Sequence, residues 1–341
     1  MAERVFTQRE LNRATLARQL LLKRVRLSVV PALERVAGLQ SQLAATAYVG
    51  LWARLEDFRP EALDRALVSG RAVRGLLMRG TVHTVAASDF ASFGAAIAGD
   101  RPSWVTPELE AIAERVAEPL REFCSEPRTR AEVMDWLDRE HGIPNDGSNG
   151  IWYAIRLRAR IAHSAAASRW RAPIHNPTFV AREHGEEDGQ VARAELVRRY
   201  LAAFGPATRA EIAGWSGMKV GSFAHLLDGL RTFRDDRGRE LLDLPRAPRP
   251  SAETPAPVRL LPKFDNVLLD RQRVLPDEYR TLVVRKNADV QPTFTVDGYV
   301  AGVWRVERKR LVTEPFAPLP RAARRELAEE AARLTAWLAD G

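Results

Sequence analysis

The segments PRTRAEVMDW (residues 127–136) and PATRAEIAGW (residues 206–215) share the pattern P-x-T-R-A-E-[VI]-x-x-W. In each copy a Thr and the Glu three residues later form a capping box, which satisfies free backbone N–H groups at the start of a helix. The Val or Ile and the Trp that follow lie on one face of that helix. A third capping box, Thr7 with Glu10, lies near the N-terminus. This recurrence predicts one supersecondary unit repeated along the chain.

The second copy continues with the spacing of a helix-turn-helix. Residues 211–215 are expected to form a short helix, residues 216–218 a turn that contains Gly217, and residues 220–230 a second helix. Two strands joined by a charged turn are expected within residues 233–244. Two helices followed by such a hairpin describe a winged helix. An unrelated helical hairpin followed by a β-hairpin is the alternative.

The first copy leads into an arginine-rich stretch. Helices are expected at residues 130–141 and 149–160, and wing strands at residues 161–164 and 169–173. Residues 151–182 hold six Arg and no Asp or Glu. Such a surface is expected to contact DNA phosphates, although a solvated basic face is the simpler alternative. The DNA-binding candidates in this stretch are Arg156, Arg158, Arg160, Arg169 and Arg171.

The pattern changes after a Pro-rich linker at residues 246–257. Strands are then expected at residues 258–261, 266–269, 293–296 and 299–306, with Asp297-Gly298 as a hairpin turn, and a helix at residues 321–338. The expected fold class is therefore α+β and mainly helical, with tandem winged-helix repeats and a small β-barrel-like C-terminal domain. The expected domains are residues 1–118, 119–190, 191–250 and 256–341.

Composition narrows the class of partner. The 341 residues include 52 Lys+Arg and 44 Asp+Glu, which favours a polyanionic partner, nucleic acid before membrane. Liberal use of Arg by a high-GC genome explains the same surplus equally well. Cys124 is the single cysteine, so neither an intramolecular disulfide nor a structural metal is expected. The charged N-terminus and the lack of any apolar run of about 20 residues predict a cytoplasmic, bacterial-type protein with access to DNA.

Conventional catalytic signatures such as G-x-S-x-G, H-E-x-x-H and the Walker loop are missing from the sequence. From the motifs discussed so far, a DNA-binding regulator and an enzyme remain equal. A regulator usually carries one winged helix per protomer and reads a palindrome as a dimer. Three such units in one chain instead favour a monomer that holds one duplex.

Five segments, in order along nearly the whole chain, resemble the AlkZ/YcaQ-type winged-helix DNA glycosylases. They are VAGLQSQ (36–42), LMRGTVH (77–83), AFGPATRAEIAGWSGM (203–218), LLPKFDNVLL (260–269) and VDGYVAGVW (296–304). The resemblance implies tandem winged helices arranged as a cradle, with a C-terminal β-domain. It also implies excision of N7-alkylated purines from double-stranded DNA in base excision repair. Some members of the family unhook interstrand crosslinks made by alkylating antibiotics, as self-resistance.

The catalytic motif of this family is Gln-x-Gln in one branch and Gln-x-Asp in the other. Here it reads Gln40-Ser41-Gln42, which is similar to the AlkZ branch, although the middle residue of the family motif is usually aliphatic. An N7-alkylguanine is cationic, so its glycosidic bond is already primed to break. A Gln carbonyl can accept a hydrogen bond from a water and orient it for attack. The resemblance therefore implies that Gln40 and Gln42 are catalytic in a monofunctional glycosylase without a cofactor.

The other resembling segments supply candidates for DNA contacts. Arg79, Thr81 and His83 would project together from an extended segment toward phosphate or sugar, unless Arg79 pairs with a local carboxylate and His83 caps a strand end. Asp265 is expected to stabilise its loop, or else to shape the lesion pocket. The Asp297-Gly298 hairpin could probe a DNA groove or be an ordinary hairpin. Lys263 is a further DNA-binding candidate, as are Arg271 and Arg273 in an expected exposed turn.

Overall fold

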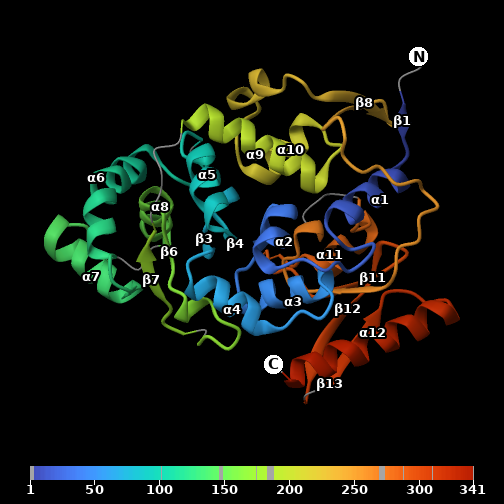
Figure 1. Ribbon diagram of the computed structural model, residues 1–341. Helices are drawn as coiled ribbons and strands as arrows, with labels where there is room; N and C mark the ends of the chain where they lie inside the picture. The colour runs from blue at the N-terminus through green and yellow to red at the C-terminus, as the bar shows by residue number, and fades with distance from the viewer. Residues whose placement is uncertain are drawn as a thin grey trace.

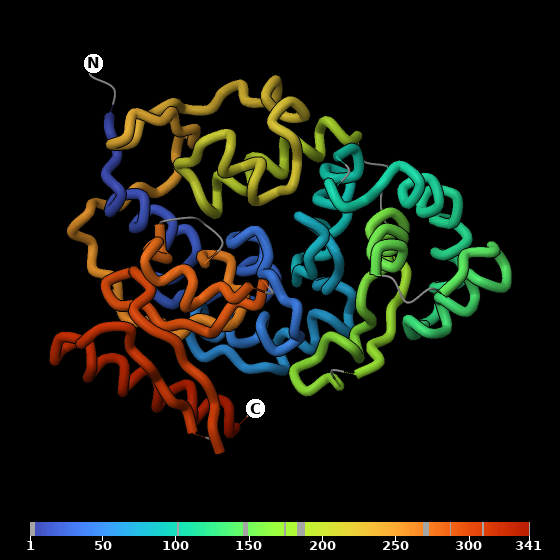
Figure 2. Tube along the Cα trace, turned by 180° about the vertical axis from the view of Figure 1, so that it is seen from behind, coloured from blue at the N-terminus to red at the C-terminus, as the bar shows by residue number. Residues whose placement is uncertain are grey.

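The computed structural model describes residues 4–100, 102–145, 149–173, 175–182, 188–268, 273–286, 288–308 and 310–340. Helices predominate, and the strands of the described residues form three separate sheets. Figure 1 shows α6–α8 at one end of the molecule and α12 at the other, with the N-terminal helices between them. The Cα trace seen from behind in Figure 2 has the same arrangement. The expectation of a mainly helical α+β fold is confirmed.

The N-terminal region supplies the centre of the molecule. Its elements are β1 (Val5–Phe6), α1 (Gln8–Arg18), α2 (Val29–Arg35), β2 (Leu39–Gln40), α3 (Ala44–Arg54), α4 (Pro60–Val68), β3 (Ala72–Leu76), the 3₁₀ turn η1 (Met78–Gly80), β4 (Val82–Ala86) and α5 (Ala87–Ile97). The predicted capping box at the start of α1 is confirmed, because Thr7 and Glu10 each bond to the other's backbone N–H. The boxes that begin α7 and α10 are confirmed in the same way.

The second region extends a sheet begun by the first. Its elements are α6 (Pro107–Phe123), β5 (Arg128–Thr129), α7 (Arg130–His141), α8 (Asn149–Ala159), β6 (Ile161–His163), η2 (Ala166–Ser168) and β7 (Thr178–Ala181). Its strands join those of the first region in the order β2-β4-β3-β6-β7-β5, with every neighbouring pair antiparallel. The two predicted helices are confirmed. The strand expected at residues 169–173 is wrong, because Trp170 turns away to pack against Tyr48 and Trp337 and the pairing strand is β7.

The third region contains α9 (Gly189–Phe204), α10 (Arg209–Ser216), the 3₁₀ turns η3 (Val220–Ser222) and η4 (Ala224–Leu226), β8 (Arg231–Asp235) and β9 (Glu240–Asp243). The predicted hairpin is confirmed, and β1 extends it by pairing parallel to β8. The helix expected at residues 220–230 is wrong, since two short 3₁₀ turns occupy this stretch. Gly221 and Gly229, the latter with a left-handed φ of +78°, weaken a continuous helix there.

The C-terminal region holds β10 (Arg259–Leu261), η5 (Asn266–Leu268), η6 (Asp277–Tyr279), α11 (Arg280–Val283), β11 (Thr293–Val296), β12 (Tyr299–Glu307), β13 (Arg310–Pro315) and α12 (Arg321–Asp340). The barrel-like expectation is wrong, because the described strands form an open antiparallel sheet in the order β10-β11-β12-β13. The strand expected at residues 266–269 is a 3₁₀ turn over residues 266–268, while residue 269 lies outside the described residues. The turn at Asp297-Gly298 and the last helix are confirmed.

Packing shows how these regions meet. One hydrophobic core joins the N-terminal helices to the C-terminal sheet, with Leu33, Tyr48 and Leu261 among its fully buried members. A second core lies around α6, α7 and α8. The boundary expected after residue 118 falls inside α6, which packs against α8, and the one after residue 190 falls inside α9. The division into four domains remains a proposal, with α6 better assigned to the second of them.

Candidate active site

A cavity of about 760 Å³ lies where the first, third and C-terminal regions meet. Gln40, Gln42, Arg79 and Thr81 line it from the first region, facing Tyr200 and Trp215 of the third and Phe264 and Leu268 of the C-terminal one. A cavity of about 830 Å³ between α2 and α4 contains none of the residues that the motifs single out. Chemistry rather than size therefore identifies the first cavity as the candidate site.

Strand geometry brings the two glutamines to the same cavity. Leu39–Gln40 pairs antiparallel with β4, Gln40 lying opposite His83. Because alternate residues of an extended chain point the same way, Gln40 and Gln42 reach the cavity together. Ser41 points into the core, where its Oγ lies 2.8 Å from Thr84 Oγ1. That hydrogen bond accommodates the hydroxyl at a position that is aliphatic in the resembling family.

The side-chain amides of the two glutamines differ in exposure and in hydrogen bonding. Gln40 is 5% exposed, and its side-chain oxygen accepts a hydrogen bond of 2.9 Å from Arg79 Nη2. Gln42 is exposed, and within the described residues its side-chain amide makes no hydrogen bond. Gln42 is therefore the amide that is free to bind a water or a substrate atom, whereas Gln40 is already engaged.

Arg79 bridges the motif to α10. It lies in η1 with a left-handed φ of 59°, and its Nη1 donates to the backbone oxygen of Trp215. Burial lowers the pKa of this guanidinium to about 10, so it remains charged at neutral pH. A Cβ on Gly217 would lie 3.0 Å from the backbone N of Arg79, which explains why glycine suits this close approach. The contact of Arg79 with phosphate remains a prediction.

The expectation of one extended segment from residue 79 to residue 83 is wrong, because the η1 turn interrupts it. Thr81 lines the cavity, but its hydroxyl donates to Met78 O. His83 is fully buried in β4, with Nδ1 3.0 Å from Thr81 O, and cannot reach a DNA backbone. Burial, aided by the charge of Arg79, lowers the pKa of His83 to about 3, so its imidazole is neutral.

The arginines of the basic stretch do not form one surface. Arg158, Arg169 and Arg171 are exposed, although Arg158 pairs with Glu114 and Arg169 with Asp64. Arg160 is half-buried against α5. Arg156 contradicts the expectation of a DNA contact, since it is 4% exposed and its guanidinium packs over the rings of Trp152 and Phe179.

The candidate residues of the C-terminal region also differ in burial and in their partners. Lys263 pairs with Asp289 at 2.8 Å and is half-buried. Asp265 forms two hydrogen bonds of 2.8 Å with buried Arg54, as expected of a structural carboxylate. Arg271 lies outside the described residues.

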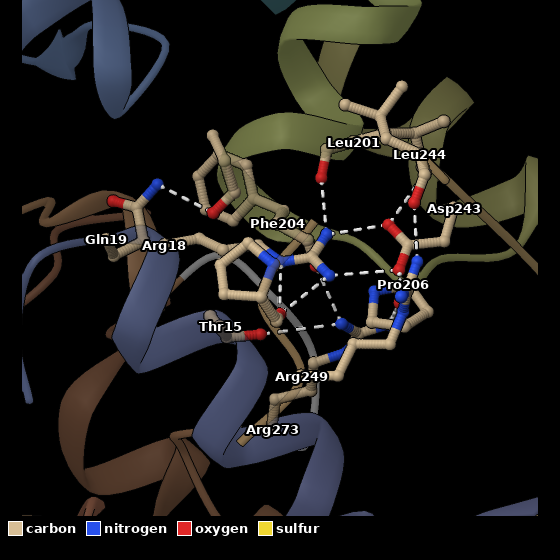
Figure 3. Close-up of polar contacts among 12 residues, drawn as sticks. Thr15, Arg18, Gln19, Leu201, Phe204, Pro206, Asp243, Leu244, Arg249 and Arg273 are labelled. Atoms are coloured by element: carbon tan, nitrogen blue, oxygen red, sulfur yellow. Dashed lines mark hydrogen bonds and ion pairs between the residues drawn. The ribbon is translucent and has the colours of Figure 1, made fainter. Parts of the chain in front are cut away.

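Arg273 is a correction, because it is buried rather than in an exposed turn. It is 2% exposed and donates to the backbone oxygens of Phe204 and Pro206 at 2.8 and 2.6 Å. Figure 3 shows it beside the buried pair of Arg18 and Asp243. Its charge joins the C-terminal region to α9, so it cannot contact DNA without unfolding this junction.

Sequence reasoning missed other polar residues of the cavity. Glu211 lines it, although the motif predicts only a capping role for this residue. Its carboxylate accepts from the N–H of Thr208 at 2.7 Å and from Arg273 at 3.1 Å. Arg237, Arg239 and Arg280 line the same cavity. The repeated motif that contains Glu211 and Trp215 singled out these residues in the sequence. A capping box alone, however, does not predict that its carboxylate faces a cavity.

Comparison with known proteins decides the family. A family model described as DNA glycosylase AlkZ-like matches residues 33–337. The chain belongs to the AlkZ-like DNA glycosylase family. A relative from Streptomyces sahachiroi, an interstrand DNA cross-link repair glycosylase, is 27% identical over 355 residues, which cover 93% of this chain and 92% of the relative.

The solved structure of Streptomyces sahachiroi DNA glycosylase AlkZ matches with a TM-score of 0.81 and 21% identity, over 98% of this chain and 97% of that one. This match supports the fold of the AlkZ-like chain. The resemblance seen in the sequence is confirmed, and the regulator alternative is not favoured. Assignment to the Gln-x-Gln branch remains a prediction.

Among the residues that the structure describes, no helix is long and apolar enough to cross a membrane. Among these same residues, no group of three or more His, Cys, Asp or Glu side chains is arranged to hold a metal ion.

Proposed function

We propose that this AlkZ-like protein is a monofunctional DNA glycosylase that hydrolyses the N-glycosidic bond of N7-alkylated purines in duplex DNA. The observation that carries the proposal is the pair Gln40 and Gln42 on one wall of the 760 Å³ cavity, with Gln42 free to bind water. Membership of the family supports the reaction class. The motif Gln40-Ser41-Gln42 contains no charged side chain, and this supports the restriction to cationic lesions.

The chemistry matches such a site. Alkylation at N7 places a positive charge on the purine, so the base leaves without strong general-acid catalysis. The enzyme must hold a water near C1′ and tolerate a transition state that resembles an oxocarbenium ion. The Gln42 carbonyl can accept a hydrogen bond from that water, and its dipole can face the developing positive charge.

Gln40 has a different role in this proposal. Its oxygen is bonded to Arg79, so it holds that guanidinium at the cavity wall rather than orienting the water itself. Arg79 remains charged and is suited to the phosphate beside the lesion. Water, rather than a protein amine, is the nucleophile, and the product is an intact abasic site.

In this proposal the DNA duplex contacts the first three regions of the chain together. We interpret the helices and hairpins of the first three regions as winged helices that form a cradle around one duplex, bound by a monomer. The exposed Arg158, Arg169 and Arg171 are the proposed phosphate contacts of the second unit. Since one relative is an interstrand DNA cross-link repair glycosylase, we include crosslinked N7-alkylpurines in the substrate class.

The test is excision from a duplex that carries one N7-methylguanine, followed by alkali treatment and gel analysis. The proposal predicts strand cleavage after alkali and no cleavage before it. Matched duplexes with the neutral lesions uracil or hypoxanthine should remain uncut. Efficient release of the neutral bases would contradict the cationic-lesion mechanism. Tight binding without cleavage of either methylated or crosslinked DNA would instead favour a non-enzymatic regulator.

A further inference from the structure

The backbone of the motif segment is held by side chains from outside it. Gln19 Nε2 donates to Val36 O at 3.2 Å. Asn266 bonds twice, because its Nδ2 donates to Gly38 O at 2.5 Å and its Oδ1 accepts from the Gln40 N–H at 2.9 Å. Both side chains are fully or almost fully buried. The chain before Gln40 is therefore fixed from α1 on one side and from the C-terminal region on the other.

Arg74 fixes the chain after Gln40. From β3 its Nε donates to Ser41 O at 3.0 Å and its Nη2 to Gln42 O at 2.8 Å. Its Nη1 donates to Ala167 O, in η2, at 3.3 Å. Arg74 is 6% exposed, and within the described residues it forms no ion pair. A buried cation whose contacts are all backbone carbonyls is costly, so stability alone does not explain it.

These contacts matter because regular pairing ends at the motif. β2 ends at Gln40, and Ser41 N donates to Val82 O at 2.7 Å as the last ladder-like bond. Beyond that bond, Arg74 is what holds the peptide of Gln42. An exposed Gln42 side chain on a loose peptide would orient a water poorly, and small displacements of a catalytic group cost large factors in rate.

We propose that Arg74 and Asn266 are positioning residues, which hold the backbone of Gln40, Ser41 and Gln42 so that Gln42 can orient the water that attacks the glycosidic bond. The inference rests on the proposed function. It also gives the C-terminal region a part in catalysis, since the loop that supplies Asn266 lines the cavity with Phe264 and Leu268. Neither positioning residue needs to touch the substrate.

The chain offers a matched control. Arg121 in the second region donates to the backbone oxygens of Ala159 and Arg182, both at 2.9 Å, far along the chain from the motif. Arg121→Ala removes the same kind of contact as Arg74→Ala but leaves the motif intact. Any general loss from deleting a carbonyl-binding arginine therefore appears in both variants.

The experiment is single-turnover excision of N7-methylguanine from a duplex at saturating enzyme, together with duplex affinity and melting temperature. Arg74→Ala and Asn266→Ala should each lower the rate constant at least tenfold, with the Kd for duplex within twofold of wild type. Arg74→Lys, which can still reach one carbonyl, should recover part of the rate. Arg121→Ala should keep the wild-type rate. Folded Arg74→Ala and Asn266→Ala variants that excise at the wild-type rate would overturn the proposal.

Amide hydrogen exchange of the motif segment, residues 38–43, gives a second readout that does not depend on activity. Exchange there should accelerate in Arg74→Ala and remain unchanged in Arg121→Ala. Should wild type fail to release the base, the proposed function fails, and exchange alone decides the positioning role. Equal exchange in Arg74→Ala and wild type would then overturn that role. If Arg74→Ala does not fold, Asn266→Ala and Arg74→Lys carry the same comparison.

Discussion

The Gln motif and the arginine-rich stretch both hold functional candidates two residues apart. In the motif the two side chains point the same way, whereas in the arginine-rich stretch they point in opposite directions. Gln40 and Gln42 leave an extended chain on the same side and both line the cavity. Arg156 and Arg158 lie on a helix, where two residues correspond to about 200° of rotation. Arg156 therefore enters the core over Phe179, while Arg158 points outward. Spacing predicts a shared face only when the element that carries it is known.

The largest effect is expected at Gln42. Gln42→Ala removes the free amide of the cavity, so the single-turnover excision rate should fall on the order of 100-fold, as for loss of one transition-state hydrogen bond. Duplex affinity should stay within twofold, because the side chain forms no other hydrogen bond among the described residues. A variant with full activity would remove Gln42 from the mechanism.

The features that depend on local contacts along the chain were predictable from the sequence. The capping boxes at Thr7, Thr129 and Thr208 span four residues each, and their prediction is confirmed. The burial of Arg273 was not predictable, because its partners are carbonyls of α9 and the chain after it. The burial of His83 likewise depends on β2, which pairs with β4 and places Gln40 opposite it. Distant partners, rather than local propensity, decided these errors.

The free energy of unfolding should depend on pH through His83, which lies opposite Gln40 in the sheet. The pKa of His83 falls from 6.5 to about 3 on folding because burial disfavours its charged form. Below pH 6.5 the unfolded chain binds a proton that the folded chain refuses, so stability decreases as the pH falls from 6.5 toward 3. This contribution reaches about 1.4 kcal/mol per pH unit.

Urea unfolding at pH 7.0, 6.0 and 5.0 measures that dependence. His83→Asn should have a shallower loss of unfolding free energy than wild type over this range. Parallel curves for the two proteins would show that His83 is protonated in the folded state, and its burial beside Gln40 would have to be revised.

A smaller effect is expected from the exposed arginines of the second region. Arg169→Ala and Arg171→Ala should each weaken duplex binding several-fold and reduce the slope of log K against log salt by about 0.9 per lost phosphate contact. The excision rate at saturating enzyme should not change. Arg325→Ala, on an 82% exposed side chain of α12, is the matched control and should bind like wild type. Equal affinities for all three variants would place the DNA elsewhere.

The smallest effect on DNA is expected at Arg156. Arg156→Met keeps an unbranched apolar stem between Trp152 and Phe179 and removes a buried charge, for which apolar replacement is often neutral or stabilising. Duplex affinity should stay within twofold, and the unfolding free energy should change by no more than about 2 kcal/mol. A marked loss of duplex affinity with an unchanged free energy of unfolding would show that Arg156 contributes to DNA binding.

Release of free 7-methylguanine from a duplex, measured by chromatography under single-turnover conditions, tests the central claim most directly. Wild type should release the base and leave an unbroken strand with an abasic site. Gln40→Ala/Gln42→Ala should bind the same duplex with similar affinity and release almost none. Release at the wild-type rate by the double variant would contradict both the role of Gln42 in orienting the attacking water and that of Gln40 in holding Arg79 at the cavity wall.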